Sequence, residues 1–87
     1  MSWDYRVTDR AIKELRKLGP QASRLIIDFL DERIAGCEDP RQLGKALKGE
    51  LGEFWRYRVG DYRILCRIDD GEVIVLVVKV GHRREVY

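Results

Sequence analysis

The sequence predicts a single α+β domain in which two N-terminal helices pack on an antiparallel four-stranded sheet, in the order βααβββ. Hydrophobic residues recur at helical spacing up to about residue 35, and side chains alternate with a period of two after residue 54. Glycine-containing turns separate the alternating segments. A chain of 87 residues has room for one hydrophobic core, so residues 1–87 are expected to form one domain.

The first half of the chain is expected to hold an edge strand followed by the two helices. Residues 3–7 alternate large and polar side chains, which is typical of a strand. Thr8 is suited to cap a first helix that ends at Gly19, and the proline that follows is suited to open a second helix. In this second helix Ile27 and Ile34 widen the apolar stripe, which indicates either a well-buried core helix or an additional partner-binding edge.

The second half is expected to hold a linker and a meander of three strands. Residues 36–52 show no periodicity and contain a proline and several glycines, so they are expected to form a linker with at most a helical turn at residues 41–48. The last strand is apolar on both faces, which predicts a central position in the sheet. The strands are expected at residues 54–59, 62–68 and 73–80, with tight turns at Gly60-Asp61 and Asp70-Gly71.

The turn at Gly60-Asp61 sets the register of the two strands that it joins. Tyr57 then pairs with Ile64 on the face towards the helices, while Arg58 stands directly opposite Arg63 on the other face, with Arg56 close by. Directly opposed like charges are unfavourable by up to about 1 kcal/mol. The cluster therefore indicates a surface for a polyanion such as phosphate, which arginine binds bidentately. The alternative is a solvated sheet face on which arginine stems cover apolar neighbours.

The apolar runs, the cysteines and the charge of the sequence exclude several classes of protein. The longest apolar run, at residues 73–78, is far shorter than the roughly 20 residues of a membrane helix, and the N-terminus lacks a signal-like stretch, so a cytoplasmic protein without membrane contact is expected. The two cysteines lack the spacing of a zinc or redox site, and no metal or cofactor is expected. Residues 41–87 carry 10 Lys and Arg against 7 Asp and Glu, which favours a nucleic-acid partner.

Several short stretches occur in order along the chain and together resemble the RelE/ParE superfamily of bacterial toxins, specifically the RelE-like mRNA interferases. The first helix matches at residues 11–19. The other matching stretches are Leu-Lys-Gly at 47–49, Trp-Arg-Tyr-Arg-Val-Gly-Asp-Tyr-Arg at 55–63, Val-Gly-His-Arg at 80–83 and Glu-Val-Tyr at 85–87. The resemblance implies the RelE-like, microbial-ribonuclease-like form of the βααβββ fold.

The resemblance also implies a function, namely the toxin of a type II toxin–antitoxin system. Such a toxin is a ribosome-dependent endoribonuclease, which cuts mRNA in the A site of the 70S ribosome by attack of a 2′-OH on the adjacent phosphate. The implied partners are the ribosome, mRNA and an acidic, RelB-like antitoxin. The catalytic positions implied by the resemblance are Arg56, Arg58, Arg63, His82, Arg83 and Tyr87. Further candidates for contacts to phosphate or ribosomal RNA are Lys45, Lys48, Arg67 and Arg84.

The sequence departs from the founding RelE proteins at two of these positions. Arg56 and Arg58 stand where those proteins have lysines, one of which is their proposed general base. Arginine stays protonated, so Arg58 is suited to hold phosphate but not to abstract a proton. His82 is one candidate for the missing base, and catalysis without a protein base is the other. Two further functions stay open, a ParE-like toxin that inhibits DNA gyrase and a non-catalytic nucleic-acid-binding relative.

Overall fold

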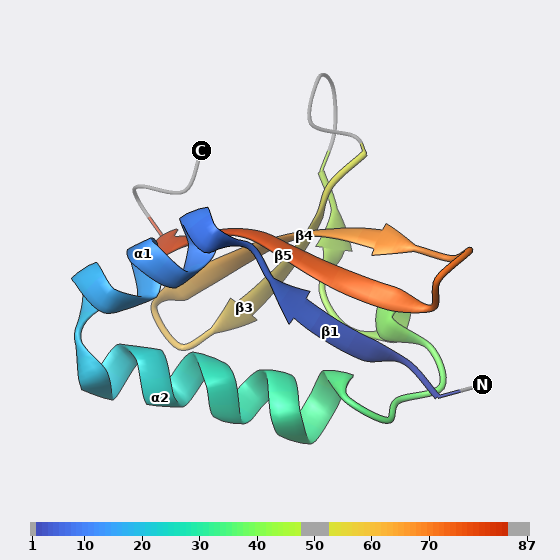
Figure 1. Ribbon diagram of the computed structural model, residues 1–87, viewed down its shortest axis with the longest axis horizontal. Helices are drawn as coiled ribbons and strands as arrows, with labels where there is room; N and C mark the ends of the chain where they lie inside the picture. The colour runs from blue at the N-terminus through green and yellow to red at the C-terminus, as the bar shows by residue number, and fades with distance from the viewer. Residues whose placement is uncertain (1, 48–52, 84–87) are drawn as a thin grey trace.

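A computed structural model of the chain describes residues 2–47 and 53–83. The helices lie on one face of a five-stranded sheet with the strand order β1-β5-β4-β3-β2 (Figure 1). The helical elements are α1 (Asp9–Leu18), α2 (Pro20–Phe29), the π-helical turn η1 (Leu30–Ile34) and the 3₁₀ turn η2 (Pro40–Gln42). The strands are β1 (Asp4–Val7), β2 (Lys45–Ala46), β3 (Trp55–Val59), β4 (Tyr62–Asp69) and β5 (Ile74–His82).

The helix boundaries follow the signals in the sequence. The Ala11 N–H donates to Thr8 Oγ1 at 3.2 Å, which confirms Thr8 as the cap of α1. Gly19 separates the two helices with a φ of +94°, in the region that favours glycine. The second helix continues through η1, whose wider turn closes with the Ala35 N–H donating to the Leu30 carbonyl at 2.9 Å.

The apolar stripe of the second helix is directed into the core. Ile34 is fully buried and Ile27 packs against the core cluster, so the well-buried helix is confirmed and the additional apolar edge at these two residues is wrong. Among the described residues the large apolar side chains left exposed are instead Ile12 and Leu25.

The sheet differs from the expected four antiparallel strands. The meander of β3, β4 and β5 is antiparallel as expected, but β1 pairs with β5 in parallel, with Val7 opposite Val77. The additional strand β2 pairs with β3, so the sheet is mixed and five-stranded. Hydrophobic alternation gives the faces of a strand but not the direction of a neighbour distant in the sequence, which is why the parallel pair was not anticipated.

Two local features of the β4–β5 pair also differ from expectation. The turn spans residues 70–73 rather than two residues, and its positive φ of 59° falls on Val73 instead of Gly71. A register shift between Leu65 and Cys66 leaves Val78 bulged, because Leu65 pairs with Lys79 while Cys66 pairs with Val77. The continuous apolar run of β5 has no alternation that could reveal this bulge.

Residues 40–46, here called the strap, are held against the sheet and are not a linker. The Trp55 indole N–H donates to the Leu43 carbonyl at 2.6 Å, and the buried Tyr57 hydroxyl donates to the Pro40 carbonyl at 2.7 Å. Arg41 reaches the turn before β5 through a bidentate pair with Asp70 at 2.8 and 2.9 Å, which lowers the pKa of that exposed carboxyl. These contacts place the two residues of β2 beside β3.

Candidate nucleic-acid interface

The face of the sheet opposite the helices carries the arginine cluster. Arg58 stands directly opposite Arg63, which confirms the register predicted from the turn. Arg56 lies between Lys45 of β2 and Leu65 of β4. Neighbours in paired positions share one face of a sheet, so the arginines, Lys45 and Leu65 lie together on this open face.

The open face combines cationic head groups with an apolar base. Arg58 is exposed, whereas Arg56 is half-buried beside Leu65, a residue that is only 5% exposed although none of the described helices covers this face. On its other side Leu65 is paired with Lys79, a cation that the sequence patterns did not single out because the bulge sets its position. Arg56 and Lys79 thus flank Leu65 at paired positions, where long cationic side chains can cover an apolar neighbour, as in the solvated-face alternative.

The hairpin turn fixes two more arginines beside Arg58. Arg63 donates from Nη1 to the carbonyls of Tyr62 at 3.0 Å and Gly60 at 3.3 Å. The Arg83 N–H donates to the carbonyl of Asp61 at 2.8 Å, which anchors the backbone just beyond β5 to the same turn. The backbone of Arg83 is thereby fixed next to the β3–β4 hairpin that carries Arg58 and Arg63.

His82 does not join the arginine cluster. It pairs with Tyr62, whose side chain packs against the core cluster beneath the helices. The two rings are perpendicular, with centroids 6.1 Å apart and an interplanar angle of 87°. His82 therefore lies on the helix side of the sheet, whereas Arg58 and Arg63 lie on the open side.

Of the remaining candidate site residues, some lie at the two ends of the open face and the others lie outside the described residues. Lys45 lies beside Arg56, as stated above. Arg67 lies towards the other end of β4, where it forms an ion pair with Glu53 at 3.0 Å and stacks 5.4 Å from the centroid of Phe54. The expectations for Lys48, Arg84 and Tyr87 fall outside the described residues.

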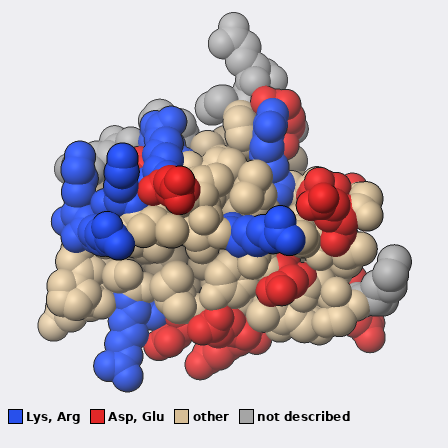
Figure 2. Space-filling model, in the orientation of Figure 1, with Lys and Arg blue, Asp and Glu red and all other residues tan. Residues whose placement is uncertain are grey.

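Charge is unevenly distributed over the molecule. In the view of Figure 2 Lys and Arg gather at the end where α1 lies, while Asp and Glu gather along the edge of α2 and at the turn before β5. Within residues 2–47 and 53–83 no cluster of His, Cys, Asp and Glu has the geometry to hold a metal ion. None of the helices in these ranges is long and apolar enough to cross a membrane.

The chemistry of the open face is that of fixed hydrogen-bond donors. Guanidinium groups stay protonated, so Arg56, Arg58 and Arg63 can bind phosphate bidentately and stabilise additional negative charge on it. A guanidinium group does not serve as a proton acceptor near neutral pH, so these three arginines act as donors and not as a general base. The surface is thus equipped to hold and polarise a phosphodiester.

Among the solved structures with this architecture are toxins in complex with antitoxins. The toxin–antitoxin complex RelBE2 of Mycobacterium tuberculosis matches with a TM-score of 0.85 and 32% identity, covering 95% of this chain and 100% of that chain. A doubly substituted Escherichia coli RelE bound to a peptide of its antitoxin RelB matches with a TM-score of 0.72 and 30% identity, covering 94% of this chain and 84% of that chain.

The sequence comparisons agree with the structural ones. A family model described as the ParE toxin of type II toxin–antitoxin systems matches residues 5–87. The toxin RelG of M. tuberculosis is 33% identical over 87 residues, which cover 100% of this chain and 98% of that protein. The chain belongs to the RelE/ParE family, and it is a toxin of a type II toxin–antitoxin system.

Proposed function

We propose that this toxin is a ribosome-dependent endoribonuclease that cleaves mRNA in the ribosomal A site and thereby inhibits translation and growth. The observation that supports the proposal most directly is the opposition of Arg58 and Arg63 on a face without helices. The repulsion between two like charges at paired positions is relieved when a phosphate binds between them.

In the proposed reaction the ribose 2′-oxygen attacks the adjacent phosphorus, and the bond from phosphorus to the 5′-oxygen of the next nucleotide breaks. The products are a 2′,3′-cyclic phosphate and a 5′-hydroxyl end, and a proton moves from the 2′-oxygen to the leaving 5′-oxygen by way of solvent or RNA groups. Arg56, Arg58 and Arg63 surround the phosphorane, whose extra negative charge they stabilise more than that of the ground state. Arg83 is proposed to join them from the adjoining turn, and Tyr87 to orient the substrate nucleotide.

The proposed partners follow from this role and from the family. They are the 70S ribosome and mRNA in the cytoplasm, together with an acidic, RelB-like antitoxin that covers the toxin. Two observations support an acidic antitoxin, the cationic open face and the antitoxin complexes among the similar structures. Lys45 is proposed as an additional contact to phosphate or ribosomal RNA because it lies next to Arg56.

Primer extension on mRNA from cells that express the toxin tests the proposal. The parental protein should produce new 5′ ends within codons of translated messages, and Arg63→Ala should produce none. A matched control is Arg24→Ala, which removes an exposed arginine from α2 and should leave the cleavage pattern unchanged.

A second function, inhibition of DNA gyrase, is favoured by the family model, which is described for ParE toxins. Intact mRNA combined with altered plasmid supercoiling in the expressing cells would establish this function and overturn the endoribonuclease. Intact mRNA with normal supercoiling would identify a non-catalytic nucleic-acid-binding relative.

A further inference from the structure

A pocket at the free edge of β3 shares the charge of the open face but reaches round to the helical layer. Its volume is about 470 Å³, within the range of roughly 300–1,000 Å³ typical of small-ligand sites. The pocket exists because β2 pairs only with Trp55 and Arg56, so that the rest of β3 has no strand beside it on this side. Gly44, with a φ of +73°, lies close against β3 and lines the pocket at this point.

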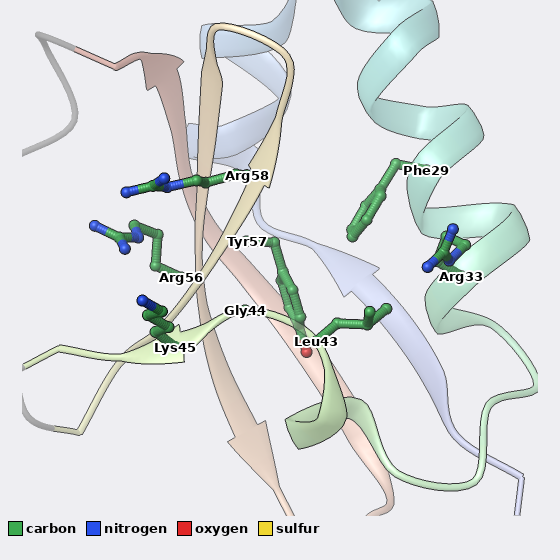
Figure 3. Close-up of a pocket in the computed structure, with 8 residues that line it drawn as sticks. All are labelled: Phe29, Arg33, Leu43, Gly44, Lys45, Arg56, Tyr57 and Arg58. Carbon is green, nitrogen blue, oxygen red and sulfur yellow. The ribbon is translucent and has the colours of Figure 1, made fainter.

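Positively charged side chains line this pocket on both sides of the edge of the sheet. In Figure 3 the side chains of Arg56, Arg58 and Lys45 extend to one side of β3, whereas Arg33 approaches from the helix on the other. Among the described residues that line the pocket, none is acidic. Arg33 is exposed and makes no ion pair with any described carboxylate, and the π-helical turn η1 carries it to this edge.

The wall between the cations is apolar. Phe29 packs on the buried ring of Tyr57, with centroids 5.6 Å apart, and Leu43 completes the surface. Phe29 is half-buried, so part of its ring stays accessible from the pocket. An apolar and aromatic wall bordered by cations is the combination that binds a nucleotide, because the base packs on the ring while the phosphates meet the charges.

We propose that this pocket binds a nucleotide of single-stranded RNA, and that Arg33 contacts its phosphate from the helical layer. The inference rests on the proposed function, since it extends the path of the RNA from the arginine cluster round the edge of β3. In this arrangement the strand passes from the phosphate held by Arg58 and Arg63 to a neighbouring nucleotide seated between Phe29 and Arg33.

Binding of a short single-stranded RNA with 2′-O-methyl riboses, which cannot be cleaved, tests the inference without the ribosome. Fluorescence anisotropy should show that Arg33→Gln raises the Kd by about tenfold, the cost of one charge-assisted phosphate contact. The slope of log K against log salt should become shallower by about 0.7, because one phosphate contact to a single strand is lost. Arg33→Lys, which keeps the charge but loses the planar fork, should fall between the two proteins.

The matched control is Arg24→Gln, which removes the same charge from the same helix. Arg24 lies on α2, before the π-helical turn that carries Arg33, and it is exposed and does not line the pocket. Its Kd should stay within about twofold of the parental value, as expected for a distant rim charge. The inference would be overturned if Arg33→Gln and Arg24→Gln lost RNA affinity equally. It would also be overturned if Arg33→Gln bound RNA as tightly as the parent while its melting curve showed that it is folded. If Arg33→Gln does not fold, the Kd of Arg33→Lys is compared with that of Arg24→Lys instead, and equal losses of affinity would then overturn the inference.

Cleavage on programmed ribosomes separates this inference from the function on which it rests. If the parental toxin cleaves and Arg33→Gln binds RNA like the parent, only the nucleotide pocket fails. If the parental toxin does not cleave but the two arginine variants differ in RNA binding as described, the endoribonuclease fails and the pocket stands.

Discussion

Arg58 and Arg63 occupy paired positions that a purely stabilising surface would fill with opposite charges. Their repulsion is unfavourable by up to about 1 kcal/mol, while the hydrogen bonds from Arg63 to the carbonyls of Tyr62 and Gly60 act in the opposite direction. Arg63→Ala should therefore change the free energy of unfolding by less than about 0.5 kcal/mol, as is usual at surface positions, and abolish growth inhibition. Denaturant titration and a growth assay measure the two effects. A variant that is folded and as toxic as the parent would remove Arg63 from the site.

His82 supplies a second test at the level of single residues. Because its ring lies against Tyr62 on the helix side, His82→Ala should cleave programmed ribosomes at close to the parental rate in single-turnover experiments. If His82 were the general base, the variant would instead lose about 10²–10⁴ in rate.

Gly44 leaves no room for a side chain beside β3. A Cβ there would lie 2.2 Å from the carbonyl oxygen of Arg56 and 2.8 Å from Tyr57 Cδ1, so the strap would have to move off β3. Gly44→Ala should lower the free energy of unfolding by more than about 2 kcal/mol, through overpacking in addition to the positive φ. Gly36→Ala is the control, because it has a similar φ of +81° but only Ser2 Oγ, at 4.0 Å, near its Cβ. If urea titration showed equal losses of unfolding free energy for Gly44→Ala and Gly36→Ala, the contact with β3 would add nothing to the cost of the positive φ.

Among the elements, β5 has one edge where, within the described residues, a side chain takes the place of the neighbouring strand. Its pairing with β1 ends at Val77, and beyond that point the Val80 N–H donates to Glu14 Oε1 of α1 at 3.0 Å. Glu14→Ala should lower the free energy of unfolding by about 1–3 kcal/mol, because it leaves a part-buried N–H without an acceptor. Glu14→Gln keeps an acceptor oxygen and should lose less. Arg10→Ala is the control, since it removes only the exposed ion pair at 4.0 Å from the same carboxylate. If urea titration showed that Arg10→Ala lowers the free energy of unfolding as much as Glu14→Ala does, the loss would be assigned to charge and not to the hydrogen bond.

The elements show which parts of the structure could be predicted from the sequence. Capping residues and periodicity are local signals, and they gave the two helices, the β3–β4 hairpin and the opposition of Arg58 to Arg63. The strap was missed because its two-residue strand forms through contacts of Trp55 and Tyr57 with residues far away in the sequence. The same limit applies to the site, since the placement of Lys79 depends on a bulge and that of Arg33 on a π-helical turn.

Over the whole molecule, the exposed charges form a mainly cationic region and a mainly acidic region, which would attract ligands of opposite charge. The open face of the sheet carries the arginine cluster with Lys45 and Lys79, whereas exposed acidic residues follow α2 and η1. A phosphate chain and an acidic antitoxin would both be attracted to the first region. Under the proposed function, an antitoxin bound to this region would silence the toxin by occupying the surface proposed for the RNA.

This arrangement predicts how the association rate of toxin and antitoxin depends on salt and on position. With an acidic antitoxin the rate constant in stopped-flow mixing should fall steeply as ionic strength rises, because screening weakens the attraction between exposed charges. Arg58→Glu should slow association by about tenfold at low salt, whereas the opposite reversal on the acidic side, Glu32→Lys, should change it by less than about twofold. If net charge alone set the rate, Glu32→Lys would accelerate association as much as Arg58→Glu slows it. That result, or a rate independent of salt, would contradict docking of the antitoxin on the open face.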